Sequence, residues 1–94
     1  MAAYVILWNF TEQGLKSIKH TTERAGVFKA QAEAHGITIK EYVWTTGEYD
    51  GVIFLDAPDD EAVMRLVFLI SSFGTLRAKI LRAFSGEEIA RVVE

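Results

Sequence analysis

The chain has 94 residues, a mass of 10.5 kDa and a net charge of −3, a size that leaves room for one domain over residues 1–94. Hydrophobic residues make up 50% of it and charged residues 24%, which excludes a disordered or low-complexity chain. The absence of cysteine excludes disulfides, a thiolate nucleophile and a cysteine-ligated metal, and the negative charge disfavours capture of nucleic acid or of an anionic membrane.

The amino terminus runs from Met1 directly into an alternating apolar segment, without a basic region or a small-residue cleavage site, so no signal peptide is predicted. The longest mainly apolar window, Ala62 to Phe73, is too short for the roughly 20 apolar residues of a membrane span. We therefore expect a cytoplasmic protein with no membrane partner.

The first predicted element is a strand over Tyr4 to Phe10, which is rich in aromatic and β-branched residues. The helical segment Thr11 to His35 would be about 37 Å long as a single helix and would overhang a strand of about 23 Å. A break is therefore expected near His20, with Thr21 as the cap of a second helix. Gly36 is predicted to end that helix in a left-handed conformation.

Two further strands, Ile37 to Thr46 and Asp50 to Asp56, are separated by a short interval that contains glycine, which is typical of a hairpin. Pro58 is predicted to occupy the first turn of the next helix, which Gly74 ends. A fourth strand is expected over Thr75 to Phe84.

Ser85 and Glu88 form a capping-box pattern that predicts a short final helix. About eight residues are too few for a stable isolated helix, so its apolar face must dock on another surface. That face consists of Ile89, Val92 and Val93. The order β-α-β-β-α-β with a carboxy-terminal helix predicts an α+β, ferredoxin-like fold with a four-stranded antiparallel sheet.

In such a fold the two long helices cover one face of the sheet and the other face is open. The first strand is nevertheless apolar on both sides, with Tyr4, Ile6 and Trp8 on one side and Val5 and Leu7 on the other. Because a large exposed apolar patch is rare on a monomer, we expect a face-to-face homodimer, the dimeric α/β barrel form of this fold. The alternative is a monomer whose last helix folds back over the open face.

The hairpin segment Gly47-Glu48-Tyr49-Asp50 resembles the Gly-x-Tyr-Asp motif that gives the GYD domain family its name. The opening YVILWNFTEQG and the stretch DAPDDEA are also similar to that family's usual segments, and the resemblance runs from about residue 3 to residue 89. It implies a ferredoxin-like, oligomeric bacterial or archaeal domain whose biochemical role is not established. It supplies no catalytic residues.

Polar side chains gather at one edge of the predicted sheet, where the first strand ends and the third and fourth begin. The candidate ligand-binding residues there are Trp8, Asn9, Tyr49, Asp50 and Arg77, joined by Thr11, Gln13 and Ser72. Such groups can orient a small polar ligand, with Asp50 or Tyr49 available for proton transfer. In the alternative interpretation they are structural: Gly47 takes a positive φ angle, Asp50 accepts hydrogen bonds from the turn amides, and Arg77 pairs with Asp50.

No metal site and no cofactor are predicted. The acidic run Asp56, Asp59, Asp60 and Glu61 is interpreted as stabilising the start of a helix. His20 and His35 lie too far apart along a helical stretch to share a metal ion. Glycine patterns for a nucleophilic serine or for phosphate binding are absent.

An RNA-binding domain has the same element order and uses aromatic residues on its open sheet, which draws attention to Tyr4, Trp8 and Phe54. The third strand lacks the basic start and the spaced aromatic residues of such domains, so no nucleic-acid partner is expected.

Two functions stay open. One is a small oligomerising module with a small-molecule cleft at the rim of the paired sheets. The other is a cofactor-free enzyme of the dimeric α/β barrel type, an isomerase or monooxygenase acting on a conjugated or aromatic substrate. The enzyme is favoured if Asp50 or Tyr49 faces a closed apolar cavity, with Asn9 or Arg77 placed to stabilise an oxyanion.

Overall fold

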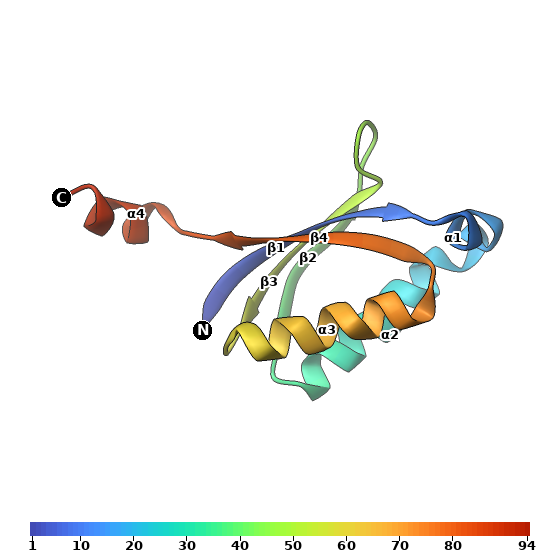
Figure 1. Cartoon of the computed structure of the whole chain (residues 1–94), viewed down its shortest axis with the longest axis horizontal. Helices are drawn as coiled ribbons and strands as arrows, with labels where there is room; N and C mark the ends of the chain where they lie inside the picture. The colour runs from blue at the N-terminus through green and yellow to red at the C-terminus, as the bar shows by residue number, and fades with distance from the viewer.

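A computed structural model describes all residues, 1–94, and arranges them in the order β-α-β-β-α-β-α (Figure 1). The four strands form one antiparallel sheet in the order β2-β3-β1-β4. Their bounds are β1 Ala2–Phe10, β2 Thr38–Trp44, β3 Gly51–Ala57 and β4 Leu76–Ala83. This strand order confirms the predicted ferredoxin-like fold.

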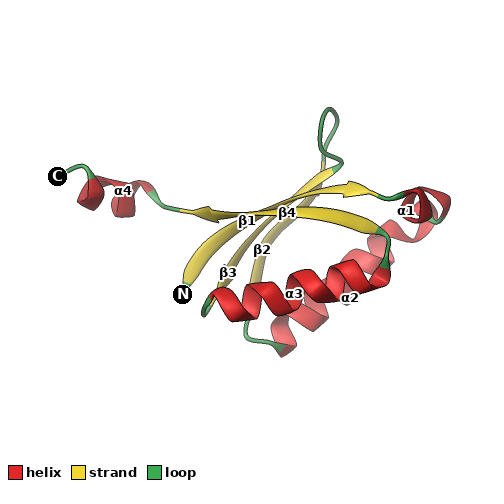
Figure 2. Ribbon diagram, in the orientation of Figure 1, coloured by secondary structure: helices red, strands yellow, loops and turns green.

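The long helices α2 (Thr21–Ala34) and α3 (Asp60–Phe73) lie on the same side of the sheet (Figure 2). The short helix α1 (Glu12–Lys16) and a 3₁₀ turn (Ile18–His20) precede α2, so the predicted break in the first helical segment is confirmed. A final short helix, α4 (Gly86–Val92), follows β4. None of the helices combines the length and the apolar character that crossing a membrane requires.

The two faces of the sheet follow the predicted alternation. Tyr4, Ile6 and Trp8 are buried beneath the helices, whereas Val5 and Leu7 point to the opposite face and are only half-buried. The core is completed by apolar side chains of α2, α3 and β3, namely Phe28, Ala32, Val63, Leu66, Ile70, Ile53 and Leu55. The hydrophobic effect therefore holds both long helices on one face and leaves the other without cover.

Both long helices end at a glycine in the left-handed region, as predicted. Gly36 has a φ of 75° and Gly74 a φ of 72°, values that side chains with a Cβ rarely adopt. After α2, the Ile37 N–H donates to the Ala32 carbonyl and the Gly36 N–H donates to the Glu33 carbonyl, the paired bonds of a Schellman motif.

The predicted starts of the two long helices are wrong in detail. Thr21 does not cap α2, because its hydroxyl oxygen accepts a hydrogen bond of 3.1 Å from Trp44 Nε1 on β2. Pro58 lies outside α3, one residue before the N-cap Asp59, whose side chain accepts from the Ala62 N–H. Thr21 is therefore the first residue of α2, one position after its N-cap His20, and Pro58 lies two residues before Asp60, the first residue of α3.

Pairing between β2 and β3 is interrupted by a register shift between Ile39 and Glu41. Lys40 is the additional residue, and its Nζ lies 3.0 Å from Oδ2 of Asp56 on β3. The outer strand β2 therefore carries a bulge.

The helix α4 projects from the rest of the chain at one end of its longest dimension of 49 Å (Figure 1). The predicted capping box is confirmed, because Ser85 Oγ accepts from the Glu88 N–H and Glu88 Oε1 accepts from the Ser85 N–H. The helix does not fold back over the open face, so the arrangement expected for a self-covered monomer is not observed. Its apolar side is uncovered, with Val92 74% and Val93 76% exposed.

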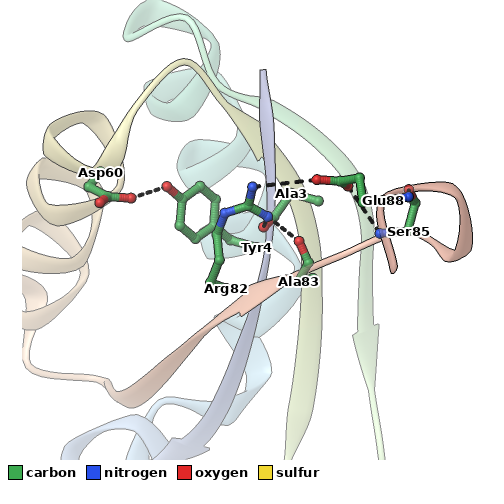
Figure 3. A network of polar contacts seen from close by, with 7 residues as sticks. All are labelled: Ala3, Tyr4, Asp60, Arg82, Ala83, Ser85 and Glu88. Carbon is green, nitrogen blue, oxygen red and sulfur yellow. Dashed lines mark hydrogen bonds and ion pairs between the residues drawn. The ribbon is translucent and has the colours of Figure 1, made fainter. Parts of the chain in front are cut away.

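Arg82 fixes the direction in which α4 leaves β4 (Figure 3). Its guanidinium donates to the Ala3 carbonyl at 3.0 Å and to the Ala83 carbonyl, and its Nη2 lies 3.7 Å from Oε2 of Glu88. The same guanidinium lies over the ring of Tyr4, 5.5 Å from its centroid. The link between Arg82 and the projecting helix is thus the ion pair with Glu88, because both hydrogen bonds of Arg82 go to carbonyls of the sheet.

Acidification is expected to loosen α4 selectively. The hydrogen bond from the Ser85 backbone lowers the pKa of Glu88 below its ordinary value of 4.5. A carboxylate with a lowered folded pKa contributes its stabilisation above the unfolded pKa and loses it as the pH falls through the folded value. The helical chemical shifts of residues 86–92, followed by NMR, should therefore decline between about pH 5 and pH 3.

The variant Glu88→Gln is the control for this titration, because its amide oxygen can still accept from Ser85 but carries no titrating proton. Its helical shifts should not depend on pH over that range. An equal decline in the variant would contradict the assignment to Glu88.

Candidate functional site

The predicted polar edge is held together by hydrogen bonds within the chain. Asp50 Oδ2 accepts from the Phe10 N–H at 2.9 Å, and the Asp50 N–H donates to both the Trp8 carbonyl at 2.9 Å and Asn9 Oδ1 at 3.0 Å. Asp50 was expected to accept from turn amides, but its partner lies on the neighbouring strand β1. Asn9 and Asp50 therefore extend the pairing of β1 with β3 beyond its last register pair, Trp8 with Gly51.

The expected pairing of Arg77 with Asp50 is wrong. Arg77 belongs to none of the ion pairs of the chain and lies opposite Asn9 in the register of β4 with β1. Tyr49 approaches Lys79 instead, whose Nζ is 5.8 Å from the centroid of the tyrosine ring. This distance permits a cation–π contact on the open face.

Trp8 is separated from the other candidates, because it lies on the face of the sheet that the helices cover and is completely buried. Its ring packs edge-on against Phe10 and Trp44, with centroid distances of 5.1 Å and 6.3 Å. A Cβ added to Gly51 would lie 1.9 Å from the indole ring and 2.6 Å from its Nε1, which has no hydrogen-bond partner. Gly51 is thus the residue that allows the indole to rest on the backbone of β3.

The three additional residues of the predicted edge also have local roles. Thr11 caps α1 by accepting from the Gly14 N–H at 3.1 Å, and its hydroxyl donates to the Gly74 carbonyl at 2.6 Å. Ser72 is exposed and donates to the Leu69 carbonyl. Gln13 lines a separate cavity described below. The edge is therefore mainly a structural junction.

The enzyme alternative requires Asp50 or Tyr49 beside a closed apolar cavity. The three main cavities of the chain are lined by none of Asn9, Tyr49, Asp50 and Arg77. Neither Asp50 nor Tyr49 faces a closed apolar cavity in which a proton could be transferred. The positive φ of Gly47, 104°, agrees with the structural interpretation of the turn.

The acidic residues at the end of β3 and the start of α3 have separate partners. Asp59 caps α3, Asp56 pairs with Lys40, and Asp60 accepts from the Tyr4 hydroxyl, a hydrogen bond that raises the pKa of Tyr4. No group of three or more histidine, aspartate or glutamate side chains lies close enough together to hold a metal ion.

Histidine and aromatic residues singled out from the sequence are dispersed. His20 pairs with Glu23 at 3.4 Å on the surface, and His35 is exposed at the end of α2. Tyr4 and Trp8 lie under the helices, so that Phe54 is the one member of the possible stacking trio on the open face. A platform for stacking bases would need several such rings side by side.

A cavity of about 340 Å³ between α2, α3 and the sheet was not anticipated from the sequence. Its walls are mostly apolar, and the remaining lining residues are polar or charged. The lining consists of Val27, Phe28, Tyr42, Ile70, Phe73, Leu76, Gln13, Arg24 and Thr75. The residues come from five elements (α1, α2, β2, α3 and β4) and the loop before β4, which is why no local pattern predicted the cavity. The only available hint was a tyrosine on the inward side of β2.

The strand order and the burial of the side chains together define a ferredoxin-like α+β domain, in which helices cover one face of the sheet and leave the other open. The model of the GYD domain family matches residues 4–93, and the chain therefore belongs to that family, as the Gly47 to Asp50 motif indicated. Comparisons with curated proteins and with solved structures each found no match.

Proposed function

We propose that the chain is a homodimerising module whose two copies pack through the open faces of their sheets. The observation that carries this proposal is the apolar surface on that face. It consists of Val5, Leu7, Val43, Val52, Phe54 and Leu81. Phe54 is 44% exposed and Leu81 50% exposed, although both lie in the middle of regular strands. Contiguous apolar patches of this kind mark protein interfaces on soluble domains.

Charges at the two edges of the open face favour one orientation of the copies. Arg77 and Lys79 project from β4, and Glu41 projects from β2 at the opposite edge; none of the three belongs to an ion pair. A two-fold axis parallel to the strands places β4 of one copy over β2 of the other, so opposite charges meet. An axis across the strands places β4 over β4, where cations repel.

The dimer is tested by light scattering and analytical ultracentrifugation. The unchanged chain should sediment as two 10.5 kDa subunits at low micromolar concentration. Phe54→Lys introduces a charge in the middle of the open face and should weaken association by more than about tenfold. Phe68→Lys is the matched control, because Phe68 on α3 is 66% exposed on the other side of the molecule and should not affect association.

A single 10.5 kDa species for the unchanged chain would overturn the proposal, as would equal dissociation by Phe54→Lys and Phe68→Lys. The axis is tested in the same measurement. Lys79→Glu should weaken the dimer, and Glu41→Lys in the same chain should restore it. Failure of this rescue, with the dimer itself intact, would overturn only the orientation.

A further inference from the structure

The cavity between α2, α3 and the sheet combines apolar walls with one arginine, and it lies on the side of the sheet that the proposed dimer does not use. We propose that it binds a small planar molecule with an aromatic body and one carboxylate group. All of its lining residues belong to one chain and lie on the covered side of the sheet, so the proposal is independent of dimerisation.

The body of the ligand is specified by the apolar walls. Val27 and Phe28 come from α2, Ile70 and Phe73 from α3, and Leu76 from the start of β4. The volume of about 340 Å³ lies at the lower end of the range for small-molecule pockets, about 300–1,000 Å³. A flat ring system buried between two helices would gain dispersion contacts on both sides.

The charge of the ligand is specified by Arg24, the only charged residue of the lining. No carboxylate of the chain pairs with Arg24; its Nη1 donates one hydrogen bond, to Ser17 Oγ at 2.5 Å. A guanidinium has five N–H donors in a planar fork that matches a carboxylate. Arg24 is exposed, so its remaining donors lie at the solvent side of the cavity, where a carboxylate on a bound ligand could accept from them.

The Tyr42 hydroxyl is a second hydrogen-bond donor of the same cavity as the Arg24 guanidinium. A small hollow of about 20 Å³ shares Arg24, Tyr42, Thr75 and Leu76 with the large cavity, so the polar groups gather at one end of it. The Tyr42 hydroxyl makes no hydrogen bond within the chain, although its ring packs against Trp8 and Phe28. Burial raises the pKa of Tyr42 to about 12, so the hydroxyl keeps its proton and can donate to a carboxylate at neutral pH.

The other candidate occupant is α4 of a second copy, whose apolar side is exposed. A helix with its side chains is about 10–12 Å across, so a cavity of about 340 Å³ does not admit a whole helix. The first turn of α4 also carries Glu87 and Glu88, of which Glu88 is already engaged by Ser85 and Arg82. A small molecule fits the volume and the unpartnered donors better.

The test is titration of the full chain with 2-naphthoate, followed by isothermal calorimetry and by NMR shifts of the Phe28 and Ile70 resonances. One molecule per chain should bind, and its uncharged analogue 2-naphthamide should bind at least about tenfold more weakly. Arg24→Gln should lower the affinity for 2-naphthoate by at least about tenfold, and Tyr42→Phe by about threefold. Arg65→Gln, at an exposed arginine of α3 outside the cavity, should leave it unchanged.

Three results would overturn the proposal: no saturable binding to the unchanged chain, equal affinity for the acid and the amide, or equal losses in Arg24→Gln and Arg65→Gln. Binding that appears only when Val92→Asp is introduced into α4 would also overturn it, because the occupant would then be the helix of a second copy. The comparison of acid with amide uses the unchanged chain, so it stays informative if a variant fails to fold. Repeating the titration with Phe54→Lys separates this result from that of the dimer.

Discussion

Replacing Gly51, the only glycine of the four strands, with alanine is expected to destabilise the chain strongly. The new Cβ would lie 1.9 Å from Cζ2 and 2.1 Å from Cε2 of Trp8, whereas carbon atoms in contact normally lie about 3.5–4.0 Å apart. Trp8 is completely buried and packed against Phe10, Tyr42 and Trp44, so its ring cannot move away without displacing the core.

Overpacking of this kind lowers the free energy of unfolding by about 3 kcal/mol. For a domain of 94 residues, that loss corresponds to a fall of about 12 °C or more in the melting temperature. Thermal and urea denaturation of Gly51→Ala at a fixed protein concentration measure both quantities.

Gly26→Ala is the matched control. Gly26 lies inside α2 and a Cβ there meets no atom within 4 Å, so the substitution should raise the free energy of unfolding by up to about 1 kcal/mol. The clash is also tested by combining Gly51→Ala with Trp8→Leu, whose smaller side chain should make the two losses less than additive. Strict additivity, or a melting temperature of Gly51→Ala equal to that of the unchanged chain, would contradict the assigned role of Gly51.

Asp50→Ala is expected to have the second largest effect. The substitution removes the acceptor of the Phe10 N–H, and a partly buried donor left without a partner costs about 2 kcal/mol. The hairpin would also lose its side-chain connection to β1, so the loss should appear both in the free energy of unfolding and in faster amide exchange at Phe10 and Asp50.

Two controls separate this hydrogen bond from general effects of the hairpin. Asp50→Asn keeps an oxygen that can accept from Phe10 and should lose only about 1 kcal/mol, the difference between a charged and a neutral acceptor. Glu48→Ala removes an exposed side chain of the same turn and should change stability by less than about 0.5 kcal/mol. If all three variants unfolded alike, the bond from Phe10 would not be the cause.

The architecture could be predicted because each element carries its own local evidence. The glycines at 36 and 74 end the long helices, and the capping box at Ser85 begins the last one. The alternation in β1 divided its side chains into the two sets that lie on opposite faces, although both sets are apolar and the pattern did not show which enters the core. The predictions at Thr21 and Pro58 failed for different reasons. At Thr21 a residue distant in the sequence binds the hydroxyl, and at Pro58 the next residue in the chain, Asp59, is the N-cap. For example, Trp44, 23 residues further along the chain, donates a hydrogen bond to the Thr21 hydroxyl.

The candidate site was harder to predict for the same reason. The residues at the edge of the sheet were correctly placed near one another along the strands, but their hydrogen bonds depend on register. Trp8 lies on the covered face and its neighbour Asn9 on the open face. The Asp50 carboxylate accepts a hydrogen bond from the Phe10 N–H on β1. The cavity around Arg24 and Tyr42 forms only when several elements pack together, so Tyr42 on the inward side of β2 was the one sign of it in the sequence.

The bulge at Lys40 bears on how far copies of this chain can assemble. A regular, uncharged outer strand accepts another strand by hydrogen bonding, and such lateral addition continues into fibres. Here the outer strand β2 is interrupted at Lys40 and followed by Glu41, and the other outer strand, β4, has Arg77 and Lys79 along it. Lateral growth is thereby disfavoured on both sides of the sheet. In the proposed dimer the copies would instead meet through their faces, and the apolar surface of the sheet would be used up in a closed pair.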